Sequence, residues 1–159
     1  MNNGLTTALT IVAAVGCALT GGVFFGFSTL VMPALRRLPP LQGLTTMQGI
    51  NAAAITPLFL GALFVPALGC LALAADALLD LGEDNAGLLL AGSLLYLLGA
   101  ILVTIAYHVP RNERLAGVDP ADADAPTHWM RYAAGWTTWN HLRAAASLAA
   151  AAVLAVSLG

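Results

Sequence analysis

The chain of 159 residues has no lysine, and only 9% of its residues are charged. Soluble domains carry about 25% charged residues, so this chain cannot cover a water-facing surface with charge. The few basic residues are all arginines and form no basic patch, which excludes a nucleic-acid-binding protein. The scarcity of charge argues against a soluble globular enzyme.

The sequence also lacks the short motifs of common catalytic and cofactor sites. It contains no phosphate-binding glycine loop, no Gly-x-Ser-x-Gly elbow, no dinucleotide motif and no His-Glu-x-x-His pair. Its two cysteines, Cys17 and Cys70, lie in apolar runs without a metal-ligand spacing. We interpret them as small buried apolar side chains, and whether they form a disulfide stays open.

Apolar residues dominate what is present. They make up 59% of the chain, and the mean hydropathy is +0.83. A membrane-spanning helix needs about 20 largely apolar residues, and the sequence offers four such stretches in one domain, at about 5–30, 48–79, 86–107 and 132–158. Short connections with turn and breaker residues separate them. We therefore predict an all-α fold, an integral membrane antiparallel four-helix bundle.

The arginines predict the orientation of this bundle. Arg36 and Arg37 follow the first span, and Arg111, Arg114 and Arg131 flank the connection between the third and fourth spans. The connection between the second and third spans is acidic. The positive-inside rule places the arginine-bearing loops in the cytoplasm, so both termini are expected outside a cytoplasmic membrane. Abundant glycine and alanine indicate close helix packing, and the alanine-rich face of the last span could also join two copies.

Polar residues interrupt the fourth span. Its clean apolar part, 144–158, extends about 22 Å, which is shorter than the hydrocarbon core of about 30 Å. Asn140, His141 and Arg143 are therefore expected at or inside the cytoplasmic boundary, where ionisable residues suggest a functional site. Trp136, Asn140 and Arg143 share a helix face, and His141 lies about 100° round from Asn140. Snorkelling of Arg143, an aromatic belt and a structural role for His141 remain alternatives.

Other polar residues are predicted at the same end of the bundle. Gln48 and Asn51 begin the second span, while His108 and Asn112 end the third. Their convergence with the fourth span predicts one polar pocket beneath the cytoplasmic loops.

A metal bound by His108 and His141, with Glu113 or His128 as a third ligand, is a less favoured alternative, and so is haem between the two histidines. His128 itself is expected in solvent. We expect no metal in the site.

Three segments of the sequence resemble one known family. The first is Gly22-Val-Phe-Phe-Gly-Phe-Ser28, the second is Val109-Pro110-x-Asn112, and the most specific is Trp136-Thr-x-Trp139-Asn140-His141-x-Arg143. In this order they resemble the anthrone oxygenase-like membrane proteins, which include a bacterial domain of unknown function related to fungal anthrone oxygenases. Members often carry asparagine where this chain has His108. The resemblance favours a bacterial protein.

The resemblance implies a membrane oxygenase that uses O₂ on a lipophilic polyphenolic, anthrone-like aromatic substrate. The fungal members oxidise anthrones without a recognised cofactor, so no cofactor is expected beyond O₂ as co-substrate. Histidine suits proton removal from the activated carbon, which we assign to His141. Arg143 and Asn140 would stabilise the oxyanion. The substrate would contact the remaining candidates, which are Trp136, Trp139, Asn112, His108, Gln48 and Asn51.

Other functions fit the same residues. The protein could be a non-catalytic membrane protein whose polar residues bind a quinone-like lipid or a partner protein. It could also be a metal- or haem-dependent membrane oxidoreductase. In each case we expect contact with the lipid bilayer and a lipophilic aromatic molecule, no nucleic acid, and a homo-oligomer as an open question.

Overall fold

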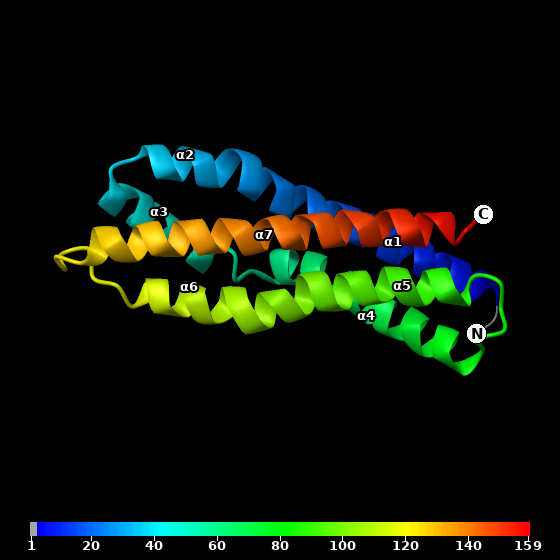
Figure 1. Ribbon diagram of the computed structural model, residues 1–159. Coiled ribbons are helices and arrows are strands. Elements are labelled where there is room, and N and C mark those ends of the chain that lie inside the picture. Colours follow the sequence, from blue (N-terminus) through cyan, green and yellow to red (C-terminus); the bar gives the residue numbers. More distant parts are fainter. Residues whose placement is uncertain (1–2) are drawn as a thin grey trace.

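The computed structural model describes residues 3–159, and every regular element in this part of the chain is helical. Four long helical rods run side by side, and α1 begins at the same end at which α7 ends (Figure 1). The first rod is continuous through α1 (Asn3–Gly26), the π-helical turn η1 (Phe27–Val31) and α2 (Met32–Arg37). Leu38 and Pro39 have extended backbones and turn the chain into the next helix.

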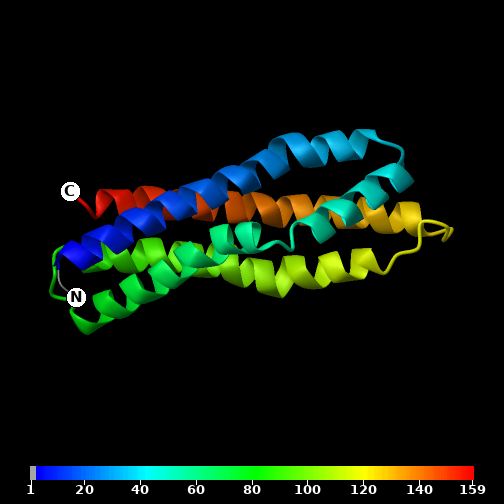
Figure 2. The same ribbon diagram turned by 180° about the vertical axis from the view of Figure 1, so that it is seen from behind.

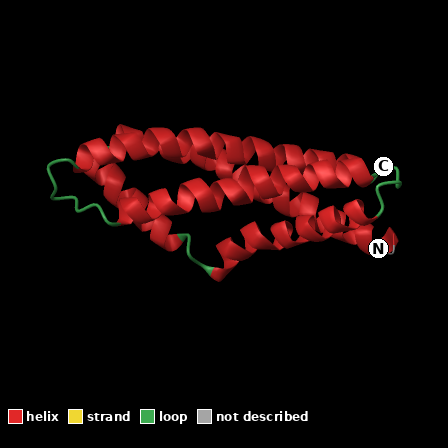
Figure 3. Ribbon diagram, turned by 60° about the horizontal axis from the view of Figure 1, so that its bottom comes forward, coloured by secondary structure: helices red, strands yellow, loops and turns green. Residues whose placement is uncertain are grey.

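The second rod is broken. α3 (Pro40–Ala53) and α4 (Pro57–Leu79) are separated by a short non-helical segment, which is visible as a loop in Figure 3. Pro57 suits the first turn of α4, and Thr56 caps it by accepting a hydrogen bond from the Phe59 amide at 3.3 Å. The stretch predicted as one span over 48–79 is therefore the end of α3, a break and then α4.

The third rod runs through α5 (Ala86–Tyr96), the π-helical η2 (Leu97–Leu102) and η3 (Thr104–His108), and α6 (Val109–Ala116). The fourth rod is the single helix α7 (Ala125–Val156). At 1.5 Å per residue its 32 residues extend about 48 Å, longer than the hydrocarbon core of a bilayer.

The rods pack in neighbouring pairs. α7 lies along α1 and against α5, and α4 lies against the same two helices. α3 packs on α7 and α6 near the end where the arginine-bearing connections lie (Figure 2). Glycines permit the closest approaches, since a Cβ on Gly16 would come 2.7 Å from Pro66 and a Cβ on Gly21 would come 2.9 Å from Leu148.

The all-helical class is confirmed, whereas the four-span bundle is recovered only in part. In the described chain, three continuous helical stretches are long and apolar enough to cross a membrane: Gly4–Arg37, Pro57–Leu79 and Ala86–Ala116. α7 has the length but not the composition, because Asn140, His141 and Arg143 interrupt it. α3 is a further helix that the prediction of four rods did not contain.

Two π-helical turns precede prolines. Pro33 follows η1 closely and Pro110 follows η3. Proline has no amide proton and its ring crowds the carbonyl four residues earlier, which weakens α-helical bonding in the preceding turn. A π turn is a wider arrangement that relieves this conflict, and such turns are frequent at functional sites.

Candidate functional site

One face of α7 carries four buried polar or amphipathic side chains. Tyr132, Trp136, Asn140 and Arg143 recur at intervals of four, four and three residues, which keeps them on one side of a helix. Asn140 is 0% exposed and Arg143 is 6% exposed. The predicted shared face of Trp136, Asn140 and Arg143 is thus present and turned into the protein.

Asn140 joins α7 to the first rod. Its Nδ2 donates to the Phe24 carbonyl and to Ser28 Oγ, both at 2.7 Å. Its Oδ1 accepts from Arg143 at 2.6 Å. All three bonds are buried, so the orientation of the Asn140 amide is determined by both helices.

Arg143 is held between helices by neutral partners. Besides Asn140, it donates to Thr104 Oγ1 at 3.0 Å, and its guanidinium lies 4.0 Å above the Phe24 ring and 5.5 Å from the Trp136 ring. Within residues 3–159 its Nε has no hydrogen-bond partner. A buried cation among neutral groups is costly unless an anion or further acceptors stabilise it. This guanidinium is therefore suited to hold a negatively charged group.

A second network centres on Asn112. Its Oδ1 accepts from Tyr132 Oη at 2.9 Å and from Trp136 Nε1 at 3.1 Å. Asn51, near the end of α3, extends this network by donating to Tyr132 Oη at 3.3 Å. α3 is thereby connected to the site just before the break that leads to α4.

His108 lies between the two networks. It is 1% exposed, and its ring makes an edge contact with Trp136 at a centroid distance of 5.0 Å. Among the described residues neither of its ring nitrogens makes a well-formed hydrogen bond, although the ring lies near the Trp139 backbone. Leaving a buried polar atom unpaired costs about 1–3 kcal/mol, so these nitrogens are available to a bound molecule.

We call this group the polar cluster. It consists of nine side chains that come from four rods and lie nearer the arginine-bearing end of the molecule: Ser28, Asn51, Thr104, His108, Asn112, Tyr132, Trp136, Asn140 and Arg143.

Three of the predicted site residues lie outside the polar cluster. His141 is exposed, because it follows Asn140 by one residue and so faces away from the buried side of α7. Trp139 is 40% exposed and stacks on Tyr107 with a ring-centroid distance of 4.8 Å. Gln48 donates to the carbonyls of Leu115 and Val118, both at 2.9 Å, and thereby holds the end of α6.

Three cluster residues were not among the predicted site residues: Tyr132, Thr104 and Ser28. Tyr132 lies four residues before Trp136, and Thr104 lies four residues before His108. Extending each predicted polar face by one helical turn would have found both residues. Ser28 was visible as a polar residue near the end of the first span, but its partner Asn140 is remote in sequence.

Neither of the two surface grooves recorded in the described residues lies at the polar cluster. One, of about 310 Å³, is apolar and runs between α1 and α4; the other lies beside Gly82–Asn85 and the end of the chain. Within residues 3–159 no three His, Cys, Asp or Glu side chains gather as a metal-binding group. His108 and His141, the two histidines considered as ligands, differ in burial, one enclosed and the other exposed.

These features define an all-helical membrane protein with a buried polar cluster at one end. The anthrone oxygenase family matches residues 50–153, which include every member of the cluster except Ser28. The chain belongs to the anthrone oxygenase family, and this membership indicates an oxygenase-like role. No curated protein and no solved structure matches the chain.

Proposed function

We propose that the protein is a membrane oxygenase that uses O₂ to oxidise a lipophilic, anthrone-like polyphenol at the polar cluster. The observation that carries this proposal is the pairing of an unpartnered, buried histidine with a buried arginine around one tryptophan ring. Proton removal converts the activated carbon of an anthrone into an electron-rich anion that reacts with O₂ directly. The site must then supply a base and a stabilising positive charge.

We assign the base to His108 and no longer to His141. A neutral imidazole offers one lone pair, and both His108 nitrogens are without partners in the described chain. His141 is exposed on another side of α7, and within residues 3–159 no hydrogen bond joins its side chain to a cluster residue. The edge contact between His108 and Trp136 would place the base beside an aromatic ring stacked on that tryptophan.

The oxyanion would be stabilised by Arg143. Its guanidinium is already oriented by Asn140 and Thr104, so little reorganisation is needed when negative charge develops nearby. Asn140 would then contribute indirectly, by orienting the Arg143 guanidinium. Asn112, whose Oδ1 is occupied by Tyr132 and Trp136, has its NH₂ group left to donate to a substrate oxygen.

We further propose that α7 completes a fourth span of this single domain, which places both termini outside and the polar cluster near the cytoplasmic side. The lipophilic aromatic substrate would then enter from the bilayer. No cofactor is assigned, because the substrate anion itself supplies the electrons to O₂. We also propose that copies of the chain associate through the alanine-rich face of α7.

The test is oxygen uptake by the purified, chelator-treated protein with a small panel of anthrones. We expect turnover by the natural chain to fall at least about 100-fold in His108→Ala, the typical contribution of a general base. The matched control is His141→Ala, which removes an exposed histidine on α7 and should retain turnover. Folding of each variant is checked by gel filtration and circular dichroism.

Three outcomes would contradict the proposal. Full turnover by His108→Ala would remove its role as the base, and loss of turnover only in His141→Ala would return that role to His141. Tight binding of an anthrone or quinone by the folded protein, with no oxygen uptake across the panel, would instead indicate a binding protein.

A further inference from the structure

Two thiols meet in the protein core, away from the polar cluster. Cys17 of α1 and Cys70 of α4 are both 0% exposed, and their Sγ atoms lie 4.0 Å apart as free thiols. Cys17 lies within the membrane-span candidate Gly4–Arg37 and Cys70 within Pro57–Leu79. The pair is therefore surrounded by protein at the depth of the hydrocarbon.

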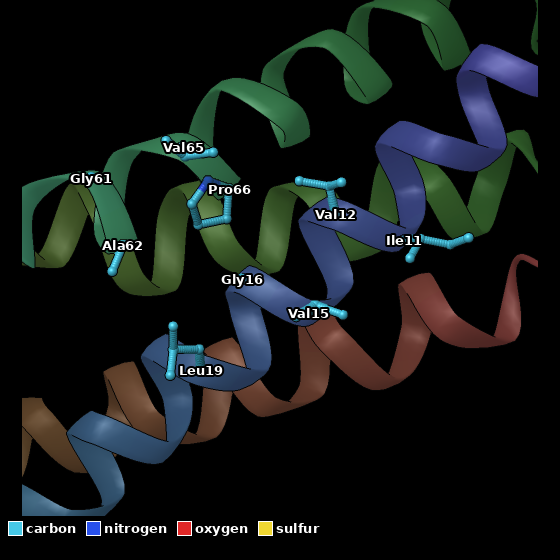
Figure 4. Close-up of a pocket in the computed structure, with 9 residues that line it drawn as sticks. All are labelled: Ile11, Val12, Val15, Gly16, Leu19, Gly61, Ala62, Val65 and Pro66. Carbon is cyan, nitrogen blue, oxygen red and sulfur yellow. The ribbon is translucent and has the colours of Figure 1, made fainter. Parts of the chain in front are cut away.

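The two helices pack closely beside this pair. A Cβ on Gly16, one residue before Cys17, would come 2.7 Å from Pro66. A Cβ on Gly69, one residue before Cys70, would come 3.3 Å from Ala13. Figure 4 shows Gly16 of α1 beside Pro66 of α4 in the apolar groove between these helices.

Close backbones are the condition that a disulfide requires. Its Cα atoms must lie within about 7 Å, and its sulfur atoms must approach to about 2.05 Å. The glycine contacts beside the two cysteines keep the helix backbones near each other, and side-chain rotation with a small helix shift would have to bring the sulfur atoms from 4.0 Å to the bonding distance. Two cysteines that merely filled space would not need to face each other across a helix crossing.

We propose that Cys17 and Cys70 form a reversible oxidation site that closes to a disulfide under lipophilic quinones. In this step the two S–H bonds break and one Sγ–Sγ bond forms, while two electrons and two protons pass to the quinone and yield a hydroquinone. Both thiols are enclosed by protein, so an oxidant would have to reach them through the apolar groove between α1 and α4, which Gly16 lines beside Cys17. Such a groove would admit a lipophilic quinone and disfavour a water-soluble oxidant. The bridge would link α1 to α4 across 53 positions of sequence.

The test treats the natural chain in membranes with duroquinone, or with glutathione disulfide as the water-soluble control. The protein is then unfolded in detergent and labelled with a mass-tagged maleimide. We expect no tags after duroquinone and two after glutathione disulfide, with reduction by a phosphine restoring both tags. The single variants Cys17→Ser and Cys70→Ser should keep one tag under either oxidant. A higher melting temperature after duroquinone, reversed by the phosphine, is expected because a bridge restricts the unfolded chain.

Two tags after duroquinone in the folded natural chain would overturn the proposal. Tags that are lost but not restored by the phosphine would also overturn it, since they would indicate quinone adducts in place of a disulfide. Equal closure by glutathione disulfide would refute the selection by lipid solubility.

Discussion

At the scale of single residues, Asn140 shows how one amide can organise a buried charge. It satisfies a carbonyl and a hydroxyl on the first rod and at the same time orients Arg143. Each group would lose a hydrogen bond without it, and leaving a buried polar group unpaired is more costly than a hydrogen bond is favourable. The position of Arg143 therefore depends on an interaction between two helices and not on α7 alone.

Replacing Asn140 by alanine is expected to lower the free energy of unfolding by about 2 kcal/mol, because Phe24 O, Ser28 Oγ and Arg143 each lose a partner. The matched control is Thr138→Ala on the same helix, since Thr138 is exposed and its hydroxyl bonds only the Ala134 carbonyl. Denaturation in mixed detergent micelles measures both variants. An equal loss in the two would show that the Asn140 network adds no stability.

At the scale of helices, glycine decides which pairs can approach. A Cβ on Gly99 of η2 would overlap Ala146 Cβ on α7. Gly92 of α5 likewise packs closely on α7, where a Cβ on Gly92 would come 2.8 Å from Leu154. The α5–α7 contact therefore depends on glycines, which have no side chain. Gly22 and Gly26 of α1, by contrast, face open space in the described structure.

The Gly99→Ala substitution should destabilise the protein by about 1–3 kcal/mol, because a methyl group attached to the α7 backbone cannot move aside as a flexible side chain can. Gly87→Ala on α5 makes the same chemical change where a Cβ meets open space in the described chain, and it should be neutral or slightly stabilising. Thermal unfolding in detergent compares them. A tolerated Gly99→Ala would mean that η2 and α7 are not closely packed there.

At the scale of the whole molecule, α7 determines how many times the chain crosses the membrane. The three candidate spans have the required composition, whereas α7 carries polar residues, of which Asn140 and Arg143 are buried against its neighbours. Exposing Asn140 and Arg143 to lipid would cost free energy, but both side chains are directed inward, where neighbouring helices supply hydrogen-bond partners. An isolated helix of this composition would be a poor span, but in the folded protein Asn140 and Arg143 are enclosed by neighbouring helices.

A topology measurement tests this argument. If α7 crosses the membrane, a reporter fused after residue 159 should be on the non-cytoplasmic side and one inserted in the 117–124 connection on the cytoplasmic side. The natural chain is compared with a variant truncated in that connection. Cytoplasmic location of both reporters would mean that α7 does not cross, and would contradict the proposal of four spans.

The apolar runs and the polar interruption of the last helix were sufficient to predict an all-helical membrane protein and a group of buried polar side chains around Asn140 and Arg143. Both follow from local chemistry, because helical spacing and the cost of charge in lipid depend on neighbouring residues. The break before α4 was less predictable, since Leu38–Ala75 carries no charge and only Pro57 marks the start of that helix.

The tertiary structure decided which histidine joins the site. His141 has the more suggestive sequence neighbours, but helix rotation turns it outward, while His108 on another rod is enclosed beside Trp136. It also decided that Cys17 and Cys70 meet, although 53 positions separate them. Both the burial of His108 and the contact between the two cysteines depend on which faces of helices remote in sequence pack together. Close contacts between small residues determine those faces, and such contacts form only when the helices assemble.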